Sequence, residues 1–180
     1  MPLTALIETT PSGLEEEVVS LFEQLRLPVL RYVLSFHIPV ADAEEIVQEV
    51  FLALFRHLRQ GKSCDNLQGW IFKVAHNSAL KQRSRTRRHA EYFSYLPVYS
   101  DAPADSSPGP EERLAATQRR QRLLAVVRAL PEQDQWCLSL RAEGLRYREI
   151  ADVLGMSLGS VANALSRALS RLTRAEEFDA

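Results

Sequence analysis

The chain has 180 residues, of which 46% are hydrophobic and 25% are charged, as in a globular protein with enough length for one large or two small domains. No uncharged apolar run is long enough to span a membrane, and residues 1–13 lack the basic start and apolar core of a secretory signal. We therefore expect a cytoplasmic protein with no membrane partner, in which Cys64 and Cys137 are reduced thiols.

The net charge of −1 hides an uneven distribution of charge along the chain. Residues 1–70 carry a net charge of −5 and residues 92–112 a net charge of −4, whereas residues 71–91 carry +5 and residues 113–180 carry +3. Phosphate is attracted by the local field rather than by the total charge. The two basic zones are therefore compatible with a nucleic-acid partner.

An N-terminal tail over residues 1–13 precedes two short predicted helices. Apolar residues at helical spacing predict an amphipathic helix over Leu14–Arg26. Pro28 suits the first turn of another helix, running to about Phe36, because that position needs no N–H donor. We therefore expect two helices in this region and not one.

A long third helix is predicted from Ala43 to about Arg59, with Asp42 as its N-cap. Its core side would consist of Ile46, Val47, Val50, Phe51, Leu54, Phe55 and Leu58. Its outer side would consist of Asp42, Glu45, Gln48, Glu49 and Leu52. Acidic residues near a helix N-terminus are favourable in themselves, so charge alone favours a solvated face over a docking face for a basic protein.

A fourth helix is predicted to begin near Gly69, after a polar loop over Gly61–Gln68. It starts with Trp70 and Phe72, at least one of which would lie in the core, and then reaches the polar Asn77. Its basic residues are Lys73, Lys81, Arg83, Arg85, Arg87 and Arg88. Like charges so close together repel one another unless an anion is bound, and cations beside aromatic and amide groups are typical of proteins that grip single-stranded nucleic acid.

A change of composition separates the two halves of the chain. Four prolines, a glycine and scattered acidic residues predict a flexible acidic linker over residues 96–110. Helices are predicted beyond it over Glu111–Leu130 and Pro131–Ala142. Because the sequence has no strand pattern, we expect an all-α protein with two small helical domains, over residues 14–95 and 111–175.

Two helices around a tight turn are predicted over Tyr147–Leu172. Gly155 suits the left-handed backbone at the end of the first helix, and Ser157 would cap the second. The inward side of the second helix would consist of Val161, Leu165, Ala168, Leu169 and Leu172, and its outward side of Ser160, Asn163, Arg167, Arg171 and Arg174. This pattern is typical of a helix-turn-helix that reads DNA, and the alternative is an ordinary helical hairpin with a solvated outer face.

Two sequence blocks together resemble a known family. The first reads DAEEIVQEVFLALFRHL and continues after a loop as NLQGWIFKVAHNSAL with its basic tail. The second reads LPEQDQWCLSLRAEGLRYREIADVLGMSLGSVANALSRALSRL. In this order, with a linker between them, they resemble the second and fourth conserved regions of extracytoplasmic-function (ECF) sigma factors of the sigma-70 family. The similarity covers most of residues 14–174.

The resemblance implies a role for each surface of the first domain. The outer side of the third helix (Asp42, Glu45, Gln48, Glu49 and Leu52) would dock on the clamp of the largest subunit of core RNA polymerase, which reverses the interpretation from charge alone. The residues that capture and open minus-ten DNA would be Ser63, Asp65, Asn66, Trp70, Lys73, Asn77, Lys81, Arg83, Arg85, Arg87 and Arg88.

In the second domain, the resemblance implies binding to the polymerase flap and recognition of minus-thirty-five DNA. The DNA-contacting residues would be Tyr147, Ser157, Ser160, Asn163, Arg167 and Arg171. Members of the family usually carry a lysine directly after the valine of the recognition helix and an arginine three residues after that valine. After Val161, this chain has Ala162 and Ala164 at these two positions. With fewer cations on phosphate, binding should be weaker and less salt-dependent, so we expect minus-thirty-five recognition that is weak, altered, or more dependent on shape and short polar contacts.

The sequence leaves three classes of function to compare: a sigma factor, a stand-alone DNA-binding regulator and an enzyme. The resemblance implies a sigma factor with core RNA polymerase and promoter DNA as partners, and it allows an anti-sigma factor as a further one. The alternative is a stand-alone helix-turn-helix regulator with an N-terminal sensing or dimerisation domain. An enzyme is not supported, since the four histidines, His37, His57, His76 and His89, lack metal-ligand spacing and no phosphate loop or nucleophile motif occurs. We expect no catalytic residue, metal or cofactor.

Overall fold

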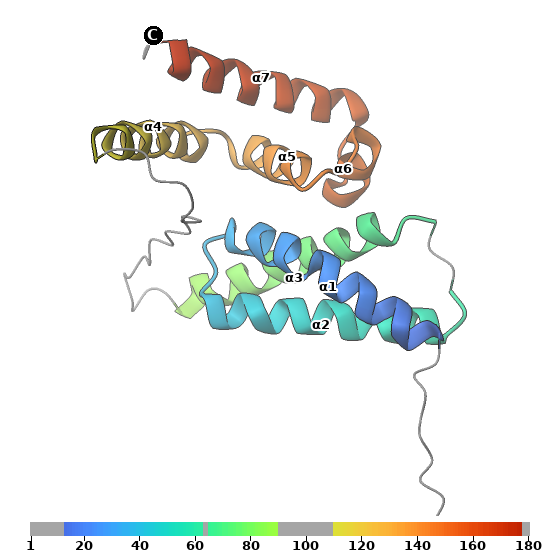
Figure 1. Ribbon diagram of the computed structural model, residues 1–180. Coiled ribbons are helices and arrows are strands. Elements are labelled where there is room, and N and C mark those ends of the chain that lie inside the picture. Colours follow the sequence, from blue (N-terminus) through green and yellow to red (C-terminus); the bar gives the residue numbers. More distant parts are fainter. Residues whose placement is uncertain (1–12, 63–64, 90–109, 178–180) are drawn as a thin grey trace, which may run out of the picture. The chain divides into compact units, whose positions relative to one another are not determined.

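The computed structural model describes residues 13–62, 65–89 and 110–177, and these residues form seven α-helices and no strand (Figure 1). The expected all-α class is therefore confirmed. The chain divides into two compact units after Gln82. Among the described helices, none combines the length and the apolar character that crossing a membrane requires. The predicted linker lies outside the described residues, except that Pro110 already belongs to a helix.

The first helix, α1 (Gly13–Leu34), is continuous through Pro28, so the prediction of two separate helices was wrong. A proline inside a helix removes one hydrogen bond and costs about 3 kcal/mol. The next turn buries Val29, Tyr32 and Val33, which are at most 1% exposed. Each such side chain contributes roughly 1.5–3 kcal/mol when fully buried, so the burial outweighs the break.

The second helix, α2 (Val40–Arg59), begins before the predicted start, with Pro39 at its N-cap. Asp42 therefore lies inside the first turn and makes no capping hydrogen bond, contrary to the prediction. Its carboxylate instead accepts a hydrogen bond of 2.9 Å from the Gln82 amide. The predicted core side is confirmed for Ile46, Val47, Val50, Phe51 and Leu54, which are buried, whereas Phe55 and Leu58 are half-buried.

The third helix, α3 (Leu67–His89), runs antiparallel to α2. Trp70 at its start contacts His57 near the end of α2, with ring centroids 4.8 Å apart, while Gln82 reaches Asp42 at the start of α2. Asn66 caps the helix, because its side-chain oxygen accepts a hydrogen bond of 2.9 Å from the backbone N–H of Gly69. Helix α3 is thus fixed against α2 at two points.

The core between α1 and α3 is an aromatic cluster around a buried histidine. The Tyr32 ring contacts the rings of Phe36 and Phe72 edge to face, with centroids 5.3 and 5.6 Å apart. His76 is 5% exposed, and its Nδ1 lies 2.8 Å from the Tyr32 hydroxyl. His76 is therefore a core residue, as expected of a histidine without ligand spacing.

The second unit contains four helices: α4 (Pro110–Arg128), α5 (Glu132–Ala142), α6 (Tyr147–Leu154) and α7 (Leu158–Glu177). Helix α7 packs against α4, α5 and α6. The core of the unit consists of Leu130, Cys137, Leu140, Leu145, Ile150, Val153, Val161, Ala164, Leu165 and Ala168. The thiol of Cys137 is free and buried, whereas Cys64 lies outside the described residues.

The inward side of α7 was predicted only in part. Val161, Leu165 and Ala168 are buried, as expected, but Leu169 is 53% exposed and Leu172 is only half-buried. The prediction for Leu169 was wrong because this residue lies beyond the edge of the buried stripe, which consists of Val161, Ala164, Leu165 and Ala168. The buried stripe of α7 is therefore rotated relative to the predicted one.

Candidate nucleic-acid interface

The turn between α6 and α7 has the geometry of a helix-turn-helix. Gly155 ends α6 with a left-handed backbone at φ 64°, as its sequence position predicts. The backbone N–H of Met156 donates to the Ala151 carbonyl oxygen at 3.0 Å. The predicted cap is also present, because the Ser157 hydroxyl accepts a hydrogen bond of 3.1 Å from the backbone N–H of Ser160. Both ends of the turn are therefore fixed.

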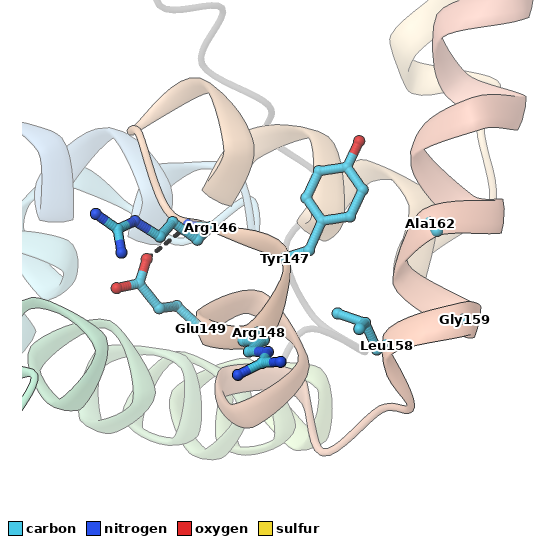
Figure 2. Close-up of a pocket in the computed structure, with 7 residues that line it drawn as sticks. All are labelled: Arg146, Tyr147, Arg148, Glu149, Leu158, Gly159 and Ala162. Atoms are coloured by element: carbon cyan, nitrogen blue, oxygen red, sulfur yellow. Dashed lines mark hydrogen bonds between the residues drawn. The ribbon is translucent and has the colours of Figure 1, made fainter.

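An open hollow of about 720 Å³ lies where α6 and α7 begin (Figure 2). Tyr147 projects from the start of α6 and Leu158 from the start of α7, and they are 40% and 47% exposed. Gly159 and Ala162 complete the apolar part of its wall, and the exposed Arg146 and Arg148 add positive charge. The N-terminal residues of a recognition helix are those that reach base edges, so the hollow lies where a helix-turn-helix of this kind would meet DNA.

Glu149 also lines the hollow, but its carboxylate has a structural role. It accepts a hydrogen bond of 2.6 Å from the backbone N–H of Arg146, which precedes α6 (Figure 2). A carboxylate in the first turn of a helix satisfies an N–H group that has no partner within the helix. Glu149 therefore fixes the start of α6, and Arg148 lies in this first turn.

The predicted minus-thirty-five residues differ in how far their polar groups are already engaged. The hydroxyls of Ser157 and Ser160 lie 2.8 Å apart and bond to each other. The guanidinium of Arg141 lies over the Tyr147 ring, 5.8 Å from its centroid. Asn163 is exposed, and within the described part of the chain its side chain makes no hydrogen bond. The amide of Asn163 is thus exposed and available for an intermolecular hydrogen bond.

Arg167 and Arg171 face other parts of their own unit. Arg167 donates two hydrogen bonds to the carboxylate of Asp134 on α5, from Nε at 3.0 Å and from Nη2 at 2.7 Å. These hydrogen bonds raise the pKa of the Arg167 guanidinium above its usual range. Arg171 lies 3.5 Å from the carbonyl oxygen of Ala129, at the limit of a hydrogen bond. Asp134 was not predicted as a site residue, and its position at the start of a helix gave no signal of a partner on α7.

The two alanines that replace the family's usual cations have different surroundings. Ala164 is completely buried, so a cation at this position of α7 would not lie on the outward face. Ala162 is half-buried and lines the hollow, where its small side chain leaves the space open. Only Ala162 therefore changes the surface that α7 presents.

A second basic surface lies on α3. Lys73, Asn77, Lys81 and Arg85 follow one another at intervals of four residues, and all four are exposed. Residues four apart lie on one side of a helix, so these four form a continuous polar stripe, which we call the α3 stripe. Arg83 lies on the same helix outside this stripe. The α3 stripe brings three of the predicted cations and the predicted amide onto one surface.

The other predicted minus-ten residues are placed less favourably or lie outside the described residues. Trp70 is half-buried against His57, and the side chain of Asn66 serves as the cap of α3. Asp65 is exposed. Ser63, and the side chains of Arg87 and Arg88, lie outside the described part of the chain. The assignment of these residues to DNA stays a prediction.

The outer side of α2 is an exposed acidic surface. Glu45, Gln48 and Glu49 are exposed, and Leu52 among them is 53% exposed. Asp42 is less exposed than these residues, because it is half-buried, and its carboxylate accepts a hydrogen bond from the Gln82 amide. An exposed leucine between carboxylates suits a protein contact with an apolar centre and a charged rim.

Within the described residues, no cluster of histidine, cysteine, aspartate or glutamate is arranged to hold a metal ion.

A helical fold with a helix-turn-helix, a basic stripe and an acidic face on separate helices is the arrangement expected of a DNA-binding transcription protein. The family model of sigma-70 region 2 matches residues 21–89, and that of sigma-70 region 4 matches residues 120–172. The two models together cover most of the chain and occur in the order expected from the sequence. The chain therefore belongs to the sigma-70 family.

Individual relatives agree with this assignment. The chain is 25% identical over 161 residues to the RNA polymerase sigma factor YlaC of Bacillus subtilis, an alignment that covers 88% of this chain and 91% of YlaC. It is 30% identical over 135 residues to the ECF RNA polymerase sigma factor SigE of Mycolicibacterium smegmatis, over 73% of this chain. The chain spans 50% of the length of SigE and 32% of that of another curated relative.

A solved structure supports the fold. The sigma factor RpoE of Bartonella quintana, crystallised in complex with the anti-sigma factor NepR, has a TM-score of 0.65 to this chain. The match covers 92% of this chain and 99% of RpoE, at 20% identity. The arrangement of helices within the units is therefore that of a known sigma-factor fold.

Proposed function

We propose that this protein is a sigma factor that binds core RNA polymerase, directs it to specific promoters and assists strand opening, with no catalysis of its own. The observation that carries this proposal is the presence of both sigma-70 regions on one chain, each with an exposed surface suited to its task. The match to region 2 argues against a stand-alone regulator, because a sensing or dimerisation domain has no need of it.

The outer side of α2 is the proposed docking surface for the clamp of the largest polymerase subunit. Its exposed carboxylates, on Glu45 and Glu49, would steer a basic surface toward it, and Leu52 would be covered in the complex. Gln48 lies between them and would add a hydrogen bond at the rim. Asp42 contributes less, because Gln82 already holds its carboxylate. The second unit would bind the polymerase flap.

The α3 stripe is the proposed surface for minus-ten DNA during opening. Lys73, Lys81 and Arg85 would hold phosphates, and Asn77 would offer an amide to an extruded base. This surface would be extended at one end by the predicted DNA contacts of the loop from Ser63 to Asn66. At the other end it would be extended by those of Arg83, Arg87 and Arg88. Trp70 would support the surface through its packing on His57.

Recognition of minus-thirty-five DNA is proposed for the start of α7 and the turn before it. Asn163 and the linked hydroxyls of Ser157 and Ser160 would face base edges or phosphates. Arg167 acts in this proposal as a positioning residue, since Asp134 holds its guanidinium. Arg171 and Tyr147 would flank the contact.

An anti-sigma factor is a further proposed partner. The solved relative RpoE forms a complex with an anti-sigma factor. A protein that covered the acidic side of α2 would block docking on the polymerase, and this side is exposed here. Such a partner would carry a basic or apolar helix for this surface.

Run-off transcription tests the proposal. Purified core polymerase is incubated with a library of promoter fragments, with and without the full-length protein. We expect discrete transcripts only when the protein is present. A stand-alone regulator would instead bind DNA tightly by itself and would leave the transcripts from core polymerase unchanged.

A further inference from the structure

The first residue of α7 has an apolar side chain at a position that is proposed to meet DNA. Leu158 is 47% exposed, although burying a leucine is worth roughly 1.5–3 kcal/mol and the core of the unit lies directly beside it. Ala162 follows one turn later on the same side of the helix. Gly159, between them, adds no side chain. The leading edge of the recognition helix is therefore apolar.

The hollow beside this edge is open and has room for a group from a partner. Its walls are mainly apolar, from Tyr147, Leu158 and Ala162, and its volume is about 720 Å³. A larger side chain at position 162 would project toward this space (Figure 2). The alanine that removes a cation from the recognition helix thus also leaves an apolar surface accessible.

Charge around the hollow identifies the kind of partner. The side chains of Arg146 and Arg148 are exposed at the start of α6, and the N-terminus of α7 adds the positive end of a helix dipole. The one carboxylate in the lining, on Glu149, is bonded to a backbone N–H. An apolar surface surrounded by positive charge suits a ligand that presents an apolar group between phosphates.

In duplex DNA that description fits thymine. Of the bases in the major groove, only thymine presents a methyl group, and apolar side chains contact it. We propose that Leu158, with Ala162 beside it, is a specificity-determining residue that reads a thymine methyl group in the upstream promoter element, while Arg146 and Arg148 hold nearby phosphates. This inference rests on the proposed function and names the base chemistry that the second unit reads.

The test replaces thymine by deoxyuridine, which lacks only the methyl group. A promoter is first selected from the library with the holoenzyme, and each thymine of its upstream element is then replaced singly. Closed-complex affinity is measured with the full-length protein bound to core polymerase. We expect about a three- to fivefold loss at one or two positions, the effect of removing one buried methyl group.

A double-mutant cycle assigns the effect to Leu158. Leu158→Ala should weaken binding to the thymine promoter by a similar factor and should bind the thymine and deoxyuridine promoters equally well. Leu158→Met should preserve the discrimination. As a matched control, Arg148→Ala should weaken both promoters equally and lower the salt dependence by about one ion. Because all these side chains are exposed, circular dichroism should show the wild-type helix content.

Two results would overturn the inference: a wild-type holoenzyme that tolerates every deoxyuridine, or a Leu158→Ala variant that still discriminates at the same positions. In either case promoter-specific transcription persists, so the proposed function stands while the thymine contact fails. If the holoenzyme selects no promoter from the library at all, the proposed function and the inference fall together.

Discussion

Asp134 on α5 and Arg167 on the recognition helix form a two-point ion pair. The Asp134 side chain is 1% exposed, whereas that of Arg167 is 57% exposed. The carboxylate thus lies in the core of the unit and is bonded by a guanidinium that reaches in from the surface. Two parallel hydrogen bonds define orientation as well as distance, so this pair fixes the rotation of α7 against α5.

The asymmetry of this pair predicts an order of stability. Arg167→Ala should be the least stable variant, because it leaves a buried carboxylate without its partner. Asp134→Ala should cost less, since the arginine that remains is free to extend into water. The double variant should resemble Asp134→Ala. Thermal melting of the four proteins measures the order, and wild-type melting temperatures for both Arg167→Ala and Asp134→Ala would show that the pair does not anchor α7.

Charge reversal on α2 should abolish docking on the polymerase. Glu45→Lys with Glu49→Lys replaces two exposed carboxylates by cations, so a basic partner surface would be repelled. Co-purification with tagged core polymerase should fall at least tenfold. Glu44→Lys is the matched control, because Glu44 is exposed on the same helix but lies outside the docking set. Unchanged co-purification of the double variant would remove α2 from the interface.

Substitutions in the α3 stripe should separate binding from opening. Asn77→Ala removes an exposed amide without a change in charge, so closed complexes should form normally while opening falls severalfold. Permanganate reactivity of promoter thymines measures opening. Lys81→Ala should lower the salt dependence of binding by about one ion, and Ser84→Ala, exposed on the same helix, should change neither quantity. Normal opening by Asn77→Ala would exclude the amide from the base contact.

Cys137 should be unreactive in the folded protein and should make stability depend on pH. Burial, and then the negative charge of Asp134, raises the pKa of its thiol from 9.0 to about 11. The unfolded chain therefore loses this proton at lower pH than the folded protein does. The thiol therefore contributes roughly 2–3 kcal/mol to the free energy of unfolding. This contribution is fully present below pH 9 and is lost as the pH rises toward 11.

Urea unfolding between pH 8 and pH 11 measures this loss in a Cys64→Ser background. The further change Cys137→Ala should flatten the dependence over that interval. Thiol labelling of the Cys64→Ser protein should proceed only as fast as unfolding. Rapid labelling at neutral pH, or an equal slope with and without Cys137, would contradict the assignment.

Helical periodicity made much of the fold predictable. The buried side of α2 could be identified from spacing alone, because Ile46, Val50 and Leu54 recur every four residues. The turn of the helix-turn-helix was equally predictable, since Gly155 and Ser157 satisfy local backbone requirements. Both features are determined by residues that lie close together in the sequence, and they can therefore be predicted from it.

The failures came from contacts between distant residues. Pro28 was expected to separate two helices, but the core behind it stabilises a continuous one. Asp42 was expected to cap α2 but bonds to Gln82, forty residues away. Arg167 lies on the exposed side of α7, as expected, but its bond to Asp134 on another helix was not predicted. No local pattern indicates which polar groups meet across the core.

The sigma-factor function is tested most sharply by run-off transcription that compares the wild-type protein with the Glu45→Lys, Glu49→Lys variant at equal concentration. We expect promoter-specific transcripts from core polymerase with the wild-type protein, and loss of those transcripts with a variant that remains folded. Transcripts that do not depend on the protein, or that persist undiminished with the variant, would contradict it.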